Sequence, residues 1–198
     1  MVSKVSICNM ALRRVGEQTI SALDDGSKNA NICNDFFEDV LQQVLRAHPW
    51  NFALARTELA LSATAPAYGW DNQYLLPADC LRVLRMEDFK TVFVVESDYL
   101  LTDNTEAKIL YIKYLTDMTL LDPLAVKVLY LSLGVEFSYN LTENNTILGG
   151  LMQQLEQAWR DARCMDAQEG TPMVSDNSDW VNARYSGKGF SILGNKVK

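Results

Sequence analysis

Few side chains in this sequence stand at spacings that suggest acid–base or nucleophilic chemistry, and the first to consider is the single histidine, His48. An imidazole can act as a general base near neutral pH. This one, however, ends a long amphipathic pattern and directly precedes Pro49, which disfavours the α region for the residue before it. We therefore interpret His48 as a helix C-terminal residue whose ring complements the terminal carbonyl dipoles.

Three sets of carboxylates are the other candidates for chemistry. Residues 24–26, Asp-Asp-Gly, resemble the start of a calcium loop, but no glutamate follows at the spacing of the bidentate ligand. We interpret them as a turn and a helix cap. Pairs such as Glu38/Asp39 and Asp161/Asp166 would do glycosidase chemistry only if both carboxyl groups faced one cleft. Adjacent residues of a helix point in different directions, so we assign Glu38 and Asp39 to a solvated face.

Sequence motifs of known catalytic and cofactor sites are absent from the chain. It has no G-x-S-x-G elbow, no H-E-x-x-H pair and no glycine-rich phosphate loop. Cys8, Cys33, Cys80 and Cys164 lie far apart and include no C-x-x-C pair, so we interpret them as reduced core thiols of a cytosolic protein. The sequence therefore predicts no catalytic residue, no cofactor and no metal ligand.

Aromatic residues cluster in the middle of the sequence, where they could stack on sugars or bases. Arg56 is the only basic residue interleaved with them, whereas nucleic-acid platforms usually combine aromatic and basic side chains. We expect core packing of a β layer, with a binding platform as the alternative. The residues are Trp50, Phe52, Tyr68, Trp70 and Tyr74.

The elements that must position these residues follow from caps and periodicity. Four helices are predicted at about residues 3–16, 27–48, 123–141 and 143–165. Ser3 and Ser27 are candidate N-caps, Gly16 can end the first helix, and Asp122 caps a third helix that starts with Pro123. That third helix is apolar nearly all round, so it must be buried from several sides.

After Pro49 the hydrophobic period changes from about 3.6 to about 2, which predicts strands. We expect one α+β body over residues 1–165: a layer of four helices, made of an N-terminal helical hairpin and two C-terminal helices, with an inserted antiparallel β-sheet or small sandwich. The β region spans about residues 50–115, with candidate strands at 50–61, 73–76, 81–86, 91–95, 99–102 and 108–114.

The last part of the chain, residues 166–198, is rich in Gly, Ser, Asn and Asp, and its large apolar residues are spaced too irregularly for a core. We predict an extended C-terminal arm that lies along a neighbouring molecule and buries one aromatic residue at a time. The proposed partner-binding residues are Met173, Trp180, Arg184, Tyr185, Lys188 and Phe190.

Charge restricts the kinds of partner. The 198 residues carry a net charge of −7, which argues against a broad basic face for nucleic acid. The four charged residues from Ala183 onward are all basic, so residues 1–182 carry −11. The chain thus combines an acidic body with a basic C-terminal segment. Two candidate targets of that segment are DNA and an acidic patch on a partner protein. The sequence shows no signal peptide and no membrane span.

Six segments, in order along the chain to about Arg184, resemble the tail tubular protein A family, the head-to-tail adaptors of short-tailed bacteriophages. Two features depart from the family pattern: the turn at residues 96–98 lacks the expected glycine, and the sequence after Arg184 matches nothing in it. The matching segments are Ile7-Cys8-Asn9-Met10-Ala11-Leu12 with Val15-Gly16, Ser21-Ala22-Leu23-Asp24-Asp25-Gly26, Leu45-Arg46-Ala47-His48-Pro49-Trp50-Asn51-Phe52-Ala53, Leu76-Pro77-Ala78-Asp79-Cys80-Leu81-Arg82-Val83, Leu121-Asp122-Pro123-Leu124 and Asp166-Ala167-Gln168-Glu169-Gly170-Thr171-Pro172.

The resemblance implies a structural virion protein rather than an enzyme, made in the host cytoplasm and located at the head–tail junction. It implies a ring homo-oligomer, expected to have twelve copies, between the portal protein and a tail nozzle similar to tubular protein B. Genomic DNA would pass through the central channel without specific binding, and no membrane would be contacted.

Two other classes of function remain as alternatives. A tail-associated cell-wall hydrolase would need a catalytic constellation, which the sequence does not display. A nucleic-acid-binding module would show steeply salt-dependent DNA binding by the free subunit, which the acidic total disfavours.

Overall fold

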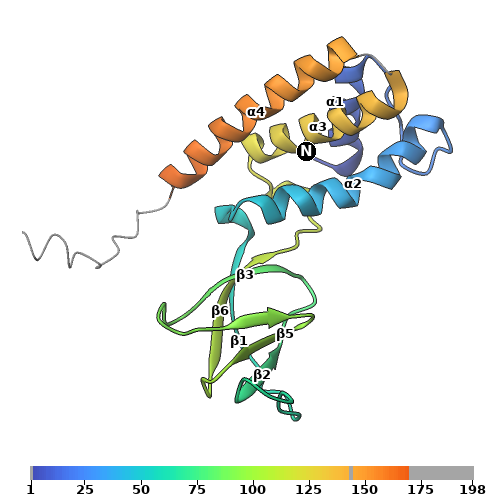
Figure 1. The fold of residues 1–198 in the computed structure, drawn as a ribbon. Coiled ribbons are helices and arrows are strands. Elements are labelled where there is room, and N and C mark those ends of the chain that lie inside the picture. Colours follow the sequence, from blue (N-terminus) through green and yellow to red (C-terminus); the bar gives the residue numbers. More distant parts are fainter. Residues whose placement is uncertain (1, 143–144, 170–198) are drawn as a thin grey trace, which may run out of the picture.

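The protein has the α+β fold that the sequence predicts. The computed structural model describes residues 2–142 and 145–169. Within them, four α-helices gather at one end of the molecule and six β-strands at the other (Figure 1). The chain passes from the helices to the strands after Ala47 and returns to the helices after Lys113.

The first two helices begin and end where their capping residues predict. Helix α1 (Lys4–Val15) has Ser3 as N-cap, whose hydroxyl accepts a bond from the Ser6 amide at 3.1 Å. It stops at Gly16, whose φ of 82° suits a residue without a Cβ. Helix α2 (Lys28–Ala47) has Ser27 as N-cap and is followed by His48 in an extended conformation. The position of His48 at the end of a helix is confirmed.

The C-terminal helices depart from their predicted bounds. Helix α3 (Pro123–Phe137) is capped by Asp122, whose carboxylate accepts a bond from the Leu124 amide at 2.7 Å. It continues as a π-helical turn, Ser138–Thr142, instead of remaining α-helical to residue 141. Helix α4 (Asn145–Gln168) runs three residues beyond the predicted end at 165.

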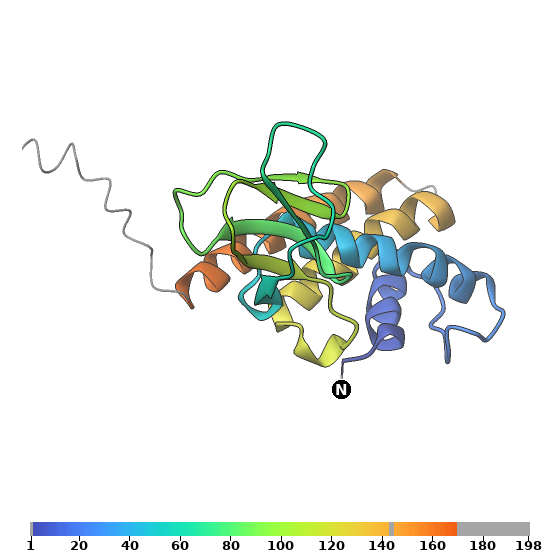
Figure 2. The same ribbon diagram turned by 90° about the horizontal axis from the view of Figure 1, so that it is seen from below.

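Helix α3 is the centre of the helical part and packs against α1, α2 and α4, so its burial from several sides is confirmed. Helices α1 and α2 differ from the expected hairpin: they contact each other over a short stretch and cross steeply in Figure 2. The reason is that α3 carries apolar residues nearly all round, so each of the two helices buries more surface against α3 than against the other.

The strands form two antiparallel three-stranded sheets, with the orders β1-β6-β3 and β2-β5-β4. Their bounds are β1 Leu54–Leu59, β2 Asn72–Leu75, β3 Cys80–Met86, β4 Val94–Glu96, β5 Tyr99–Thr102 and β6 Ala107–Lys113.

Two predicted strands differ from the structure by more than one residue at an end, whereas the other four agree to within one residue. The strand expected at 50–61 starts later, because Asn51–Ala53 form a 3₁₀ turn before β1. The strand expected at 91–95 is the shorter β4, because side chains rather than a backbone ladder hold its first residues. Thr102 Oγ1 donates to the Val92 carbonyl and Asn104 Nδ2 donates to Thr91 Oγ1, both at 3.0 Å.

Two hydrophobic cores meet at strand β6. The larger core lies between the helices and includes Ile112 of β6. The smaller core lies between the two sheets and includes Ile109 and Tyr111 of the same strand, together with Tyr74 and Leu100 of the second sheet. One strand therefore ties the helical part to the β region.

The turn between β4 and β5 contains a strained residue. Ser97 has a φ of 54°, the left-handed region that favours glycine, and no other non-glycine residue of the described ranges has a positive φ. Only two residues, Ser97 and Asp98, separate Glu96 from its ladder partner Tyr99. Two-residue hairpin loops require this conformation, which explains why glycine was expected here.

Candidate interaction surfaces

The end of helix α4 is joined to the segment between α2 and β1. Nε2 of His48 lies 2.8 Å from Oδ2 of Asp166, and these side chains are 17% and 11% exposed. The other carboxylate oxygen of Asp166 accepts a bond from the Asn51 amide at 3.0 Å. Asn51 Nδ2 in turn donates to the Asp166 backbone carbonyl at 2.6 Å. We call this set of contacts the α4 joint.

Aromatic rings pack directly beneath the α4 joint. Trp50 is 1% exposed, stacks on Trp159 of α4 with ring centroids 5.7 Å apart, and meets His48 edge to face at 4.8 Å. Its indole nitrogen donates to the Val44 carbonyl at 2.9 Å. Trp50 therefore belongs to the helical core and not to the β layer in which it was expected.

The α4 joint corrects the predicted start of the arm and the role of one carboxylate pair. Asp166 lies within α4 and not in an extended segment, because its carboxylate is held by His48 and Asn51. Asp161, its proposed glycosidase partner, accepts a bond from Gln157 at 2.7 Å. The two carboxylates have separate partners, and neither contacts the other.

Glu38 lies on a partly solvated face, with its side chain 43% exposed, and it also links three elements. Its carboxylate is bonded by Lys4 Nζ of α1 and by the hydroxyl of Tyr114, which directly follows β6. Burial acts to raise the pKa of Glu38, but the bonds from Lys4 and Tyr114 outweigh it and hold the pKa below its usual value. Burial and the Glu38 carboxylate raise the pKa of Tyr114 to about 12.

The cysteines are only partly the core thiols that the sequence predicts. All four are free, and Cys8 of α1 and Cys33 of α2 are buried. A hydrogen bond between these two thiols, together with burial, raises the pKa of Cys8. Cys80 is half-buried, whereas Cys164 is exposed on α4, where the prediction of a core position is wrong.

The possible calcium loop is a turn and a cap, as interpreted. The Asp25 carboxylate accepts a bond from the Ser27 amide at 2.9 Å, and Gly26 has a φ of 71°. Bonds from Ser27 lower the pKa of Asp25. Over residues 2–142 and 145–169, no group of histidine, cysteine and carboxylate side chains is arranged to hold a metal ion.

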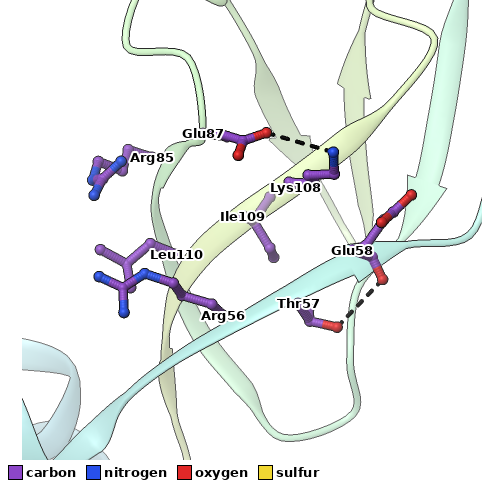
Figure 3. Close-up of a pocket in the computed structure, with 8 residues that line it drawn as sticks. All are labelled: Arg56, Thr57, Glu58, Arg85, Glu87, Lys108, Ile109 and Leu110. Atoms are coloured by element: carbon purple, nitrogen blue, oxygen red, sulfur yellow. Dashed lines mark hydrogen bonds and ion pairs between the residues drawn. The ribbon is translucent and has the colours of Figure 1, made fainter.

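A charged hollow of about 430 Å³ lies on one face of the β1-β6-β3 sheet (Figure 3). In the ladder, Leu110 of β6 lies between Arg56 of β1 and Arg85 of β3. Lys108, two residues before Leu110 and therefore on the same face of β6, forms ion pairs with Glu87 at 3.6 Å and Glu106 at 3.3 Å. The lysine therefore has carboxylate partners close by.

The two arginines of this hollow have no carboxylate partner in the described part of the chain. In Figure 3 their guanidinium groups lie on the same side of the sheet, above and below Leu110. Arg85 lies over the Phe89 ring at 4.3 Å and donates to the Met86 carbonyl at 3.3 Å. We call Arg56, Leu110 and Arg85 the arginine groove.

A second hollow, of about 350 Å³, lies at the tip of the β region between residues 66–70 and the Glu96–Ser97 turn. Tyr68, Trp70 and Tyr99 line it, and Tyr68 is 89% exposed. The expectation of core packing for the aromatic run thus holds for Tyr74 and is wrong for Tyr68. The only signal for this difference in the sequence is the pair Pro66 and Gly69 on either side of Tyr68.

The proposed arm residues cannot be located on the molecule. Met173, Trp180, Arg184, Tyr185, Lys188 and Phe190 all lie outside the described residues. Helix α4 ends at Gln168, so the last described residues lie beside the α4 joint. Among the helices that the structure describes, none is both long and apolar enough to span a membrane.

Sequence comparison does not assign the chain to a family. No model of a known protein family matches the sequence, and no curated protein matches it either.

Proposed function

We propose that this protein is a head-to-tail adaptor of a short-tailed bacteriophage, a virion structural protein that assembles as a ring between the portal and the tail nozzle. The proposal includes one layer of four helices, a β region below it and an arm beginning near residue 170. Genomic DNA would pass through the ring. The free subunit would be made in the host cytoplasm.

The observation that carries the proposal is that the segments resembling the adaptor family meet at the joints of the fold. His48 and Asn51 of one such segment bind Asp166 of another, 115 residues from Asn51 along the chain. Arg46 Nη1, in the same segment as His48 and Asn51, donates to the Leu81 carbonyl, which joins α2 to β3 and links this segment to a third one. The resembling segments therefore contribute contacts that hold separate elements of the fold together.

Residues of the resembling segments also hold the loop between α1 and α2 in place. Asn9, in the first resembling segment, donates to the Ile20 carbonyl at 2.9 Å and accepts from the Ile20 amide at 2.8 Å. Asn34 Nδ2 holds the same loop by donating to the Leu23 carbonyl at 2.7 Å. Among the described residues, the resembling segments act through caps and clamps, which supports a structural role rather than a catalytic one.

A ring subunit also needs exposed surfaces that can contact neighbouring subunits and other partner proteins. The exposed apolar residues of the β region, including Leu75 and Tyr99 on the β2-β5-β4 sheet, offer one such surface. The arginine groove offers another of different chemistry. Helices, sheets and arm can thereby meet different neighbours.

Charge supports the passage of DNA without binding. If acidic residues of the body face the channel, they repel phosphates over a range of about 8 Å at physiological salt. The net charge of −11 over residues 1–182 supplies such residues. Mapping the charge of the channel in an assembled ring tests this point, and a basic lining would contradict it.

The central experiment is assembly with the portal protein of the same phage. The full chain, mixed with portal and imaged by electron microscopy, should add a closed ring to one end of the portal. A variant that ends at Glu169 keeps Asp166 in place, so it should fold with the same circular dichroism spectrum yet fail to dock.

Two further variants make this test sharper. Replacing Trp180, Tyr185 and Phe190 together by alanine should weaken docking as truncation does, whereas replacing the exposed Met152 of α4 should leave it unchanged. Normal portal binding by the truncated chain would refute the arm. Absence of any ring, with or without portal, would refute the adaptor itself.

A further inference from the structure

The arginine groove holds two guanidinium groups that have no carboxylate partner among the described residues. Arg56 makes no hydrogen bond or ion pair there, and Arg85 is bonded only to a backbone carbonyl and an aromatic ring. Three carboxylates lie near, but Glu87 and Glu106 are paired with Lys108. Glu58 lies opposite the same lysine in the ladder and forms no ion pair with either arginine. A guanidinium binds carboxylates well through two parallel bonds, so the groove suits a ligand with two carboxylates.

The spacing of the groove restricts that ligand. Arg56 and Arg85 lie on the two strands that flank Leu110, and strands in a sheet are about 4.8 Å apart, so the two backbones are about 10 Å apart. An extended segment with three residues per turn places residues i and i+3 on one side, about 9 Å apart. A sequence of the form Asp-x-x-Asp therefore fits the two arginines.

This chain contains such a sequence just beyond its described part. Asp176 and Asp179 are the only acidic residues after Glu169, they are three positions apart, and Trp180 follows them directly.

The segment is also long enough to reach the groove of its own subunit. Helix α4 ends beside Asn51, and Arg56 is five residues further along, within about 17 Å even for a fully extended chain. The seven residues from Glu169 to Asp176 can span up to about 24 Å. A ligand attached by so short a chain has a local concentration in the millimolar range, well above that of a second copy in solution.

We infer that Asp176 and Asp179 bind Arg56 and Arg85 of the same subunit, so that the arginine groove fastens the base of the C-terminal arm to the β region. This deepens the proposed function, because a fastened base would leave the basic residues Arg184 and Lys188 and the aromatic residues beyond Trp180 directed toward a partner. It concerns the free subunit and can fail while the adaptor role stands.

Cleavage of the full chain by chymotrypsin after Trp180 tests the inference. Reversing the groove charges (R56E/R85E) or the segment charges (D176R/D179R) should speed this cleavage by roughly three- to tenfold, since two exposed ion pairs are lost. Combining both sets restores opposite charges and should return the rate to that of the unaltered chain. A free peptide of residues 170–198 with the same substitutions corrects for changes in the intrinsic cleavage rate.

A matched pair of charge reversals controls for net charge. Arg13 and Lys28 are exposed basic residues of the helical part, so R13E/K28E should leave the rate unchanged and should not rescue D176R/D179R. Circular dichroism of each variant checks that the body remains folded.

Each other outcome overturns the inference. Unchanged cleavage in R56E/R85E would mean that the groove does not hold the segment. Acceleration by the groove variant alone would mean that another carboxylate fills it. Protection that rises with protein concentration would mean that the ligand comes from a second copy, and failure of the combined variant to recover would exclude direct pairing.

Discussion

At the scale of single residues, the clearest case of local backbone strain is Ser97. A residue with a Cβ in the left-handed region costs roughly 1–2 kcal/mol, and glycine avoids this cost while losing some entropy on folding. Ser97 occupies that region at φ 54° in the two-residue turn between β4 and β5. The strain lies beside the aromatic hollow of the β region, which Ser97 helps to line.

Replacing Ser97 by glycine should stabilise the protein by about 0.5–1 kcal/mol, because the turn geometry is kept and its strain is removed. Urea unfolding followed by circular dichroism measures the change. Asp98→Gly, in the same turn but without a positive φ to relieve, is the control and should destabilise the chain by a similar amount. Equal effects of the two variants would show that Ser97 is not strained.

Glu38 should make stability depend on pH in the acid range. Its pKa is lowered in the folded state, so its contribution is fully present above the unfolded value of about 4.5 and is lost as the pH falls through the folded value. Glu38→Gln should therefore cost roughly 1 kcal/mol at pH 7, with the side chain partly exposed, and much less at pH 3. Urea unfolding at both pH values provides the measurement.

Asp35 is the matched control for this prediction. It lies exposed on the same helix and has no hydrogen bond or ion pair in the described part of the chain. Asp35→Asn should shift stability little at either pH. A cost of Glu38→Gln that is the same at pH 3 as at pH 7 would contradict the charge-based account.

At the scale of elements, the sequence predicted the helix ends that neighbouring residues determine. It missed the helix end that depends on contacts with residues far away in the sequence. The ends of α1 and α2 follow from Ser3, Gly16 and Ser27, whose capping is set by neighbouring residues. The end of α4 could not be predicted in this way. Its last turn is held by His48 and Asn51, which precede the β region in the sequence, whereas α4 follows it. The same distance explains why His48 was recognised as a helix end but its partner was not.

Asp166→Ala should show how much the α4 joint contributes. It removes a bond to His48 and leaves the Asn51 amide without its acceptor, which should cost about 2–3 kcal/mol in urea unfolding. Asp161→Ala, on the same helix, loses only a bond to Gln157 one turn away and should cost under about 0.5 kcal/mol. Similar costs for both would mean that the joint does not stabilise the fold.

At the scale of the whole molecule, the two cores differ in size and share one strand. The helical core contains most of the buried residues, whereas the β core is built around a few side chains such as Tyr74 and Leu100. The sequence allowed either one sheet or a small sandwich, since periodicity assigns strands but not their partners. The pairing of β2 with β5 and of β1 with β6 depends on contacts between residues far apart in the chain.

Because the two cores differ in size, we expect the β region to unfold locally more easily than the helical part. Leu100→Ala should cost about 2–4 kcal/mol in the β core and speed hydrogen exchange at the amides of β2 and β5 while those of α1 and α3 keep their protection. Leu131→Ala, fully buried in the helical core, is the control and should speed exchange everywhere. Equal acceleration in α1 and β5 by Leu100→Ala would show that the molecule opens only as one unit.

The exposed thiol of Cys164 has a practical consequence. It lies on α4 two residues before Asp166, whereas Cys8 and Cys33 are buried and burial raises the pKa of the half-buried Cys80. A maleimide fluorophore should therefore attach first at Cys164, since accessible thiols react fastest. The native sequence thus supplies its own reporter position, and changes in emission could follow the last turn of α4 in real time when a binding partner is added.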